Sequence, residues 1–289
     1  MTTGSAGISF RKNELIRKGL SGGIFIAPVT SAAITKSNLF DPTTGALVNP
    51  LPAGYRDLGF LSTAGAVFAR TAKTTDIDSW QSDSHTRTDI ISDVTTITIT
   101  PQETNQSTIG LFLGVDASTI TPGVNGAYEV DRPAISIPRY YRVLALAVDT
   151  TTNGEIVYGR FLPRALVTAF ASQTMANAAT PLEFGVTITG YLDSVLGYPE
   201  AFLFGGEGLP ALQVDMGFAR AVTVTTNSTS LLVATTGNFY PNDVGAVVSG
   251  AGITVGTTIA SYTDSTHVVM SAAATASAAG VAVSIAGEA

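Results

Sequence analysis

Cysteine is absent from the sequence, and histidine is nearly so, with His85 and His267 the only two among 289 residues. Without cysteine neither a disulfide framework nor a thiolate metal site can form, and folding does not depend on an oxidising compartment. A zinc site would have to use carboxylates, an unusual ligand set for that metal. We therefore expect each histidine to be a surface or turn residue, and we expect no metal and no cofactor.

Charged side chains are also scarce. They make up 13% of the residues, against about 25% in a typical soluble domain, while hydrophobic residues reach 45%. Large exposed apolar surfaces usually mark interaction sites, so this composition favours self-association over a monomer whose small residues inflate the hydrophobic count. The formal net charge of −7 argues against static binding to phosphate backbones, which depends on Lys and Arg. It does not exclude passing contact with DNA.

Long hydrophobic runs are missing too. The longest uninterrupted apolar run, residues 143–148, is far shorter than the roughly 20 residues that span a bilayer. The first residues, up to Arg17-Lys18, lack the apolar segment of a secretory signal. We expect the chain to fold in the cytoplasm where it is made, without a membrane partner.

Motifs that would indicate catalysis are not found. The sequence has no Gly-x-Ser-x-Gly elbow and no Walker motif, and Gly205–Gly208 is interpreted as a turn. The densest acidic run lacks the spacing of a calcium loop, so we interpret it as a solvated loop or acidic face rather than a calcium site or an acid–base pair. It consists of Asp76, Asp78, Asp83, Asp89 and Asp93. We expect no enzymatic activity and no catalytic residue.

What is present is mainly the alternation typical of β-strands. Residues 94–100 and 182–189 each alternate apolar with small or polar side chains, which predicts strands with one buried face. Residues 142–161 predict a hairpin, because Asn153-Gly154 is a strong two-residue turn signal. Residues 22–28 predict a short strand that ends at proline.

Helical signals are few. Thr100-Pro101-Gln102-Glu103 is a good helix start, because Thr can cap the first turn and Glu can close a capping box. It predicts a helix of about a dozen residues that ends near Gly114. A short amphipathic helix is expected over residues 10–19. The glycine- and proline-bearing residues 38–52 and 197–210 predict loops.

The composition changes near residue 220. Residues 221–289 contain no Lys or Arg, and only Asp243, Asp264 and Glu288 are acidic. Short apolar segments alternate there with turn residues, which predicts strands at 222–224, 231–233, 267–270 and 281–285. We expect a large domain at residues 1–219 and a small all-β domain at residues 220–289.

The order of several sequence elements resembles the major tail tube proteins of long-tailed (siphovirus-type) bacteriophages, especially those infecting actinobacteria. The resemblance covers about residues 10–215. Its central elements are Tyr55-Arg56-Asp57-Leu58-Gly59, the Gly65 turn, Asp76-Ile77-Asp78-Ser79-Trp80-Gln81, Arg87-Thr88-Asp89, Glu103-Thr104 and Leu113-Gly114. Similar elements flank them at Leu15–Gly19, Gly23–Pro28, Arg160–Ala165, Val186–Thr189 and Phe204-Gly205-Gly206.

The resemblance implies a mainly β protein, with a tail-tube β-sandwich or barrel-like domain and one flanking α-helix. The small C-terminal all-β domain would be appended on the tube exterior. Subunits of the family form hexameric rings that stack into a tube around the tape measure protein. Further implied partners are the tail terminator and distal tail proteins, and double-stranded DNA that passes through without specific binding. The implied location is the virion tail, assembled in the host cytoplasm.

Two features of the sequence bear on such a tube. Residues 1–219 contain 19 acidic and 14 basic residues, so we expect an acidic lumen that repels DNA from its wall. The residues 38–52 loop and the residues 76–89 segment are candidates for contact between rings.

Two other functions stay open. The chain could be another virion component, such as a head decoration or minor tail subunit, which would form small oligomers or bind capsids instead of forming tubes. It could also be a carbohydrate-binding adhesin that acts through residues 221–289. The single tryptophan, Trp80, lies outside that region, and sugar sites usually use exposed aromatic platforms.

Overall fold

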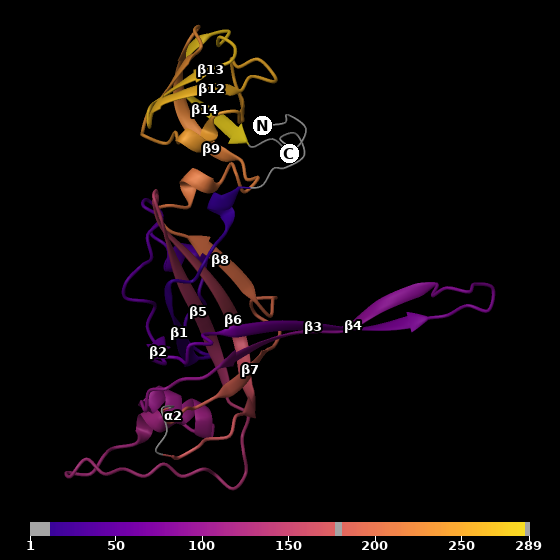
Figure 1. Ribbon diagram of the computed structural model, residues 1–289, viewed down its shortest axis with the longest axis vertical. Coiled ribbons are helices and arrows are strands. Elements are labelled where there is room, and N and C mark those ends of the chain that lie inside the picture. The colour runs from indigo at the N-terminus through magenta and orange to yellow at the C-terminus, as the bar shows by residue number, and fades with distance from the viewer. Residues whose placement is uncertain (1–11, 177–180, 287–289) are drawn as a thin grey trace. The chain divides into compact units, whose positions relative to one another are not determined.

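The computed structural model describes residues 12–176 and 181–286 and consists mainly of β-strands (Figure 1), which confirms the predicted fold class. The strands form two separate sheets, one of eight strands and one of six. The chain divides into two compact units. The first contains Gly19–Val148 and Val157–Gly205, and the second contains Asp149–Ile156, Gly206–Ala289 and Met1–Lys18, as far as these are described. The predicted domain boundary near residue 220 stays a prediction.

The larger sheet belongs to the first unit. Its strands, in spatial order, are β2, β1, β5, β6, β7, β4 and β3, and β8 pairs with another part of β6. In chain order they span β1 Ser21–Pro28, β2 Arg56–Asp57, β3 Val67–Ile77, β4 Arg87–Ile99, β5 Tyr140–Thr151, β6 Gly154–Phe170, β7 Val186–Gly190 and β8 Ala201–Gly205. The strands predicted at residues 22–28 and 94–100 and the hairpin at 142–161 are confirmed.

The centre of this sheet is buried on both faces. Along β5, Val143 and Ala145 join one hydrophobic cluster, whereas Leu144 and Leu146 join the other. Because alternate residues of a strand point to opposite faces, this explains the uninterrupted apolar run of the sequence. Helix α2, Gln106–Leu113, covers one face through a buried leucine, and the segment around the short helix α1, Lys36–Leu39, covers the other.

Helix α2 begins later than its sequence predicts. It spans Gln106–Leu113, and its N-cap is Asn105, whose side chain accepts a hydrogen bond from the backbone of the third helical residue at 2.9 Å. The predicted start at Thr100 is wrong, because Glu103 instead accepts a backbone hydrogen bond from a neighbouring loop. The predicted end is confirmed: Gly114 adopts the left-handed conformation with φ 71°.

Three further predictions differ from the structure. The helix expected at residues 10–19 is only a 3₁₀ turn, η1 at Asn13–Leu15, with residues 10 and 11 outside the described part. The strand expected at residues 182–189 begins only at Val186. The loop expected at residues 197–210 contains strand β8, in which Leu203 is buried between two exposed phenylalanines. The flanking Gly and Pro residues concealed this short apolar alternation.

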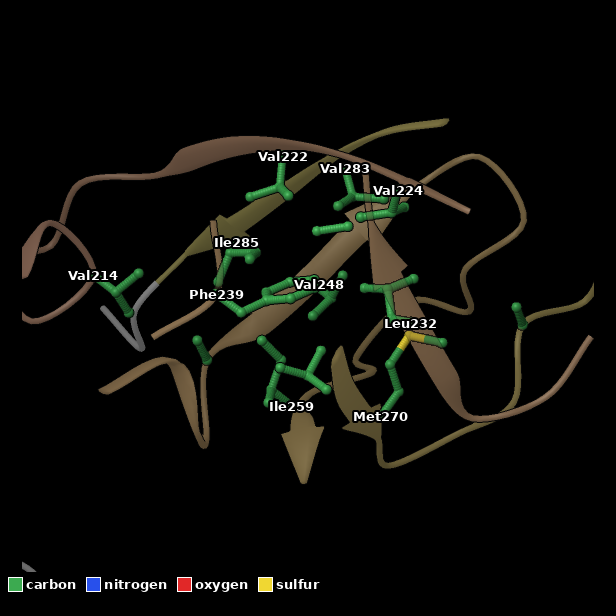
Figure 2. Packing of buried hydrophobic residues seen from close by; sticks show 14 residues of the cluster. Val214, Val222, Val224, Leu232, Phe239, Val248, Ile259, Met270, Val283 and Ile285 are labelled. Carbon is green, nitrogen blue, oxygen red and sulfur yellow. The ribbon is translucent and has the colours of Figure 1, made fainter. Parts of the chain in front are cut away.

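The second unit holds the six-stranded sheet, in the order β11, β14, β9, β10, β13 and β12. Its side chains pack into a core of 14 buried residues that includes Leu232, Phe239 and Val248 (Figure 2). The four predicted strands are present, and β11 and β12 are additional. The strands are β9 Arg220–Asn227, β10 Leu231–Ala234, β11 Val247–Gly250, β12 Ile259–Asp264, β13 His267–Met270 and β14 Ser277–Ala286.

A buried ion pair lies at the start of this sheet. Arg220, on β9, contacts the carboxylate of Asp243, and Asp243 is completely buried. The same carboxylate accepts a hydrogen bond from the backbone N–H of Tyr240 at 2.8 Å, and the Arg220 guanidinium lies 4.6 Å from the centre of the Tyr240 ring. Burial raises the pKa of Asp243 against the opposing effect of these partners. The pair connects β9 to the short 3₁₀ helix η4, Pro241–Asp243.

Across the described ranges, no helix is long and apolar enough to cross a membrane.

Candidate assembly surfaces

The most exposed element of the first unit is the hairpin of β3 and β4, which extends beyond the other strands of its sheet (Figure 1). Only Thr96–Ile99 of β4 pair with β7, whereas the outer part of β4 pairs with β3 alone. Every side chain from Ala69 to Ile77 is exposed. An isolated two-stranded ribbon is at best marginally stable in water, so this hairpin is expected to gain contacts in an assembly.

Strand β3 is also the end strand of the sheet. In the part of the chain that the structure describes, its 11 residues have no strand partner on the outer side. A long edge of this kind presents unpaired backbone groups that can pair with another chain. The hairpin is therefore open both at its edge and on its faces.

Polar contacts fix the shape of this hairpin. Arg70 on β3 donates to Asp93 on β4, with Nε–Oδ1 at 2.8 Å, and the hydrogen bond holds the pKa of Asp93 below its usual value. Thr88 donates to Asp76 across the strands at 2.6 Å. The aspartates of the acidic run thus lie on two strands and the turn between them. Thr88 is opposite Asp76, so the neighbouring Asp89 points to the other face of the hairpin, and the run does not form a single acidic face.

The tip of the hairpin is closed by its own polar groups. The His85 ring lies 2.6 Å from the Asp78 carboxylate, and the Ser79 and Thr86 hydroxyls are 3.0 Å apart. Trp80 takes no part in these contacts and its side chain is 95% exposed. Among the described residues, no group of three or more His, Asp or Glu side chains could hold a metal ion.

The second histidine, also expected to be a surface or turn residue, lies at a turn of the six-stranded sheet. His267 begins β13, and its Nδ1 atom lies 3.0 Å from the Asp264 carboxylate. Hydrogen bonds from Thr266 and His267 hold the pKa of Asp264 well below its usual value. These contacts fix a hairpin turn between β12 and β13, which is a structural role.

The candidate loop at residues 38–52 is less exposed than its composition suggests. Leu39 and Phe40 are buried in the sheet's second cluster, and Phe40 forms a β-bridge with Leu47. Its exposed residues are those of the turn near Thr43 and the pair Asn49-Pro50. At the turn the Asp41 carboxylate accepts two backbone hydrogen bonds at 2.8 Å. Of the two segments considered for contact between rings, the hairpin therefore offers far more free surface.

Sequence reasoning missed a third exposed segment, residues 120–139. It has neither helix nor strand, and it follows the 3₁₀ helix η2, Ala117–Thr119. Ile135 and Ile137 along it are 79% and 73% exposed. Long structureless segments are uncommon in compact domains and usually either have a function or serve as linkers. The signal that the sequence offered for this segment was the pair Ile135 and Ile137 between Pro133 and Pro138.

The comparisons with known proteins agree with an assembly role. Residues 10–196 match a family model described as phage tail tube protein, and a search of curated proteins finds no match. The matched range includes strands β1 to β7, helix α2 and the whole β3–β4 hairpin, and it excludes the six-stranded sheet. The match covers more than half of the chain, in agreement with the resemblance of its sequence elements. The chain therefore belongs to the phage tail tube protein family, and it is a structural protein that assembles with copies of itself into the tail of the virion.

Proposed function

We propose that copies of this chain form hexameric rings, and that the rings stack into the hollow tube through which the phage genome leaves. The observation that carries the proposal is the β3–β4 hairpin. It is exposed on both faces and open along one edge, in a chain whose family builds phage tails. Such an element reaches full burial only when neighbouring subunits cover it.

The arrangement of surfaces supports an extended assembly. A contact between two different surfaces of the same chain closes into a ring when its rotation closes, and otherwise generates an open stack. The hairpin edge and the residues 120–139 segment are two different exposed surfaces of one unit. We propose that one mediates contacts around a ring and the other contributes to contacts between rings.

We further propose that the tube wall repels DNA. The hairpin residues 67–99 contain five aspartates and three basic residues, a formal net charge of −2. Two of the aspartates, Asp89 and Asp93, form ion pairs with arginines, which leaves the other three near the hairpin tip. An acidic surface keeps DNA mobile, because stable binding requires Lys and Arg. A positive electrostatic potential along the bore of an imaged tube would contradict this proposal.

The remaining implied partners follow from a tube of this kind. We propose that the tape measure protein occupies the bore during assembly in the host cytoplasm, and that the tail terminator and distal tail proteins bind the tube ends. The family is structural, so we propose no enzymatic activity for the chain.

Negative-stain imaging of the purified protein tests the main proposal. We expect filaments with a central channel at high protein concentration. Discrete small oligomers, or binding to capsids instead of filament growth, would favour the other virion component, a head decoration or minor tail subunit.

For the second unit we propose a small domain at residues 220–289 on the tube exterior. Its core cluster is formed by residues between Val214 and Ile285 and shares no member with the two clusters of the larger sheet. A chain that ends at residue 219 should therefore still form tubes, of smaller outer diameter in projection. Glycan binding by the full chain that is lost in this shorter chain would support the adhesin function for the domain.

A further inference from the structure

The first unit contains an apolar groove that nothing in the described chain fills. Its volume is about 720 Å³, and it is lined by parts of β1, β5, β6 and β8 together with the residues 59–66 loop. Three phenylalanines on its rim are strongly exposed: Phe60 at 78%, Phe202 at 59% and Phe204 at 51%. Small residues such as Gly22, Gly65 and Ala147 also line it.

One wall of the groove is held in place before anything binds. The Arg160 guanidinium lies 3.8 Å from the ring centre of Phe68 and 4.6 Å from that of Phe202. The same guanidinium donates to Glu200 at 2.6 Å, which fixes its position. A preformed wall lowers the entropy lost on docking, so it favours binding of a matching apolar group.

The hairpin of the same unit carries an apolar side chain that packs against almost nothing in its own chain. Trp80 is 95% exposed at the hairpin tip, and the tip is ordered by polar contacts that do not involve it. Tryptophan is among the residues that contribute most binding energy at protein interfaces. Its exposure at the tip of a projecting hairpin is therefore the pattern expected of an interface anchor.

Trp80 cannot reach the groove of its own copy. Phe68, at the start of β3, lines the groove, and Trp80 lies beyond the other end of the same strand. An extended strand from Val67 to Ile77 covers about 30 Å, at roughly 3.3 Å per residue. Strand β3 pairs with β4 along its length, with one irregularity between Lys73 and Thr74, and the hairpin extends away from the rest of the sheet (Figure 1). A tryptophan in the groove would therefore come from another copy.

We propose that the hairpin tip of one copy inserts Trp80 into the groove between Phe60, Phe202 and Phe204 of a second copy. This inference rests on the proposed tube, and it names the two surfaces that meet in it. The contact joins different surfaces, so a joined pair still offers one free groove and one free tip, as a growing assembly requires. One indole buries roughly 150–250 Å², well below the roughly 1,000 Å² of a specific interface, so the exposed hairpin strands supply the remaining contact area.

The single tryptophan makes the proposal directly measurable by fluorescence. We expect the emission maximum of the full chain to move to shorter wavelength as tubes form, and acrylamide quenching to fall, because Trp80 passes from water into an apolar site. Tubes that form while Trp80 stays fully quenchable would overturn this inference and leave the tube itself standing. If no tubes form and the emission does not change, both proposals fail.

Cysteine cross-linking identifies the site that receives the tip, since the chain has no cysteine of its own. Trp80→Cys and Phe204→Cys chains, carrying different tags, are mixed under assembly conditions and oxidised. We expect a disulfide-linked dimer that contains both tags. The matched control pairs Trp80→Cys with Val255→Cys, which is 99% exposed in the second unit and should not cross-link. Equal cross-linking in both mixtures, or none with Phe204→Cys in assembled tubes, would contradict the proposed contact.

Discussion

The carboxylate of Glu103 occupies the space that a Cβ atom on Gly59 would need, with its nearest atom 2.1 Å from that position. Gly59 also has φ +81°, a conformation that disfavours other residues. From this place Glu103 accepts a hydrogen bond from the Phe60 backbone N–H at 2.8 Å and so ties the residues 55–61 segment to the chain before α2. Gly59 and Glu103 are both among the elements that resemble tail tube proteins, and here they form one contact.

We predict that Gly59→Ala destabilises the first unit by about 2–4 kcal/mol. The added Cβ strains the backbone at this position, and it also displaces the Glu103 carboxylate from its hydrogen bond with Phe60. Urea unfolding measures the change. Gly65→Ala is the matched control, because Gly65 has φ +63° but nothing within 4 Å of the added Cβ. Gly65→Ala should lower the free energy of unfolding by about 1 kcal/mol, because it introduces backbone strain but no clash. Equal effects of the two substitutions would show that the Glu103 contact contributes nothing.

The same contact shows where the sequence was insufficient. Thr100 to Glu103 has the composition of a helix start, and local propensity favours it. In the structure the tertiary hydrogen bond of Glu103 replaces the capping box, and Asn105 caps the helix instead. Strands with one buried face were predictable because their burial alternates, whereas β8 was hidden between glycines and a proline.

The assembly surfaces were only partly predictable. The acidic run drew attention to residues 76–89, but a ribbon exposed on both faces has no apolar alternation that would identify its strands. The groove could not be predicted at all. Phe204 lies far from Phe60 and Phe68 in the sequence, and the pairing of β8 with β6 and of β1 with β5 brings their segments together.

A pH-dependent contribution to stability is expected from Asp193. Its carboxylate accepts hydrogen bonds from the backbone N–H groups of Val195 and Leu196, at 2.9 and 3.1 Å, and these hold its pKa below the ordinary value of 3.8. A lowered pKa in the folded state stabilises the protein above the unfolded pKa, and the contribution is lost as the pH falls below about 4 through the folded value.

The comparison for this prediction is Asp193→Asn, which keeps an acceptor oxygen but cannot ionise. Urea unfolding at several pH values should show the wild type as the more stable chain at pH 6. The difference should shrink as the pH falls from 4 to 2. A difference that is constant over this range would mean that the charge of Asp193 does not strengthen the turn.

We predict that Phe239→Ala affects the second unit alone. Phe239 is 1% exposed in the centre of that unit's core (Figure 2), and large-to-small changes of buried aromatic residues cost about 3–5 kcal/mol. Calorimetry should show one thermal transition at lower temperature and the other unchanged, because the hydrophobic clusters share no residues. Val255→Ala, at a fully solvated position of the same unit, is the control and should change neither transition. If both transitions move with Phe239→Ala, the two units unfold together.

We predict that Trp80→Ala separates assembly from folding. Trp80 has almost no contact within its own chain, so the free energy of unfolding of the monomer should change by less than about 0.5 kcal/mol. An anchor tryptophan at an interface contributes about 2 kcal/mol or more, which corresponds to a roughly 30-fold rise in the protein concentration needed for tube growth. Sedimentation of tubes across a concentration series measures this value.

Trp80→Phe tests whether assembly depends on how well an apolar side chain at the hairpin tip fills the groove. A phenyl ring fills part of the same groove, so this variant should form tubes at a concentration between those of the wild type and Trp80→Ala. The exposed-site control Val255→Ala should assemble like the wild type, because that side chain is 99% exposed and lies outside the unit that carries the hairpin and the groove. If Trp80→Ala assembled at the wild-type concentration, the hairpin tip would have to lie free in the tube, and the residues 120–139 segment would become the leading candidate for contact between rings.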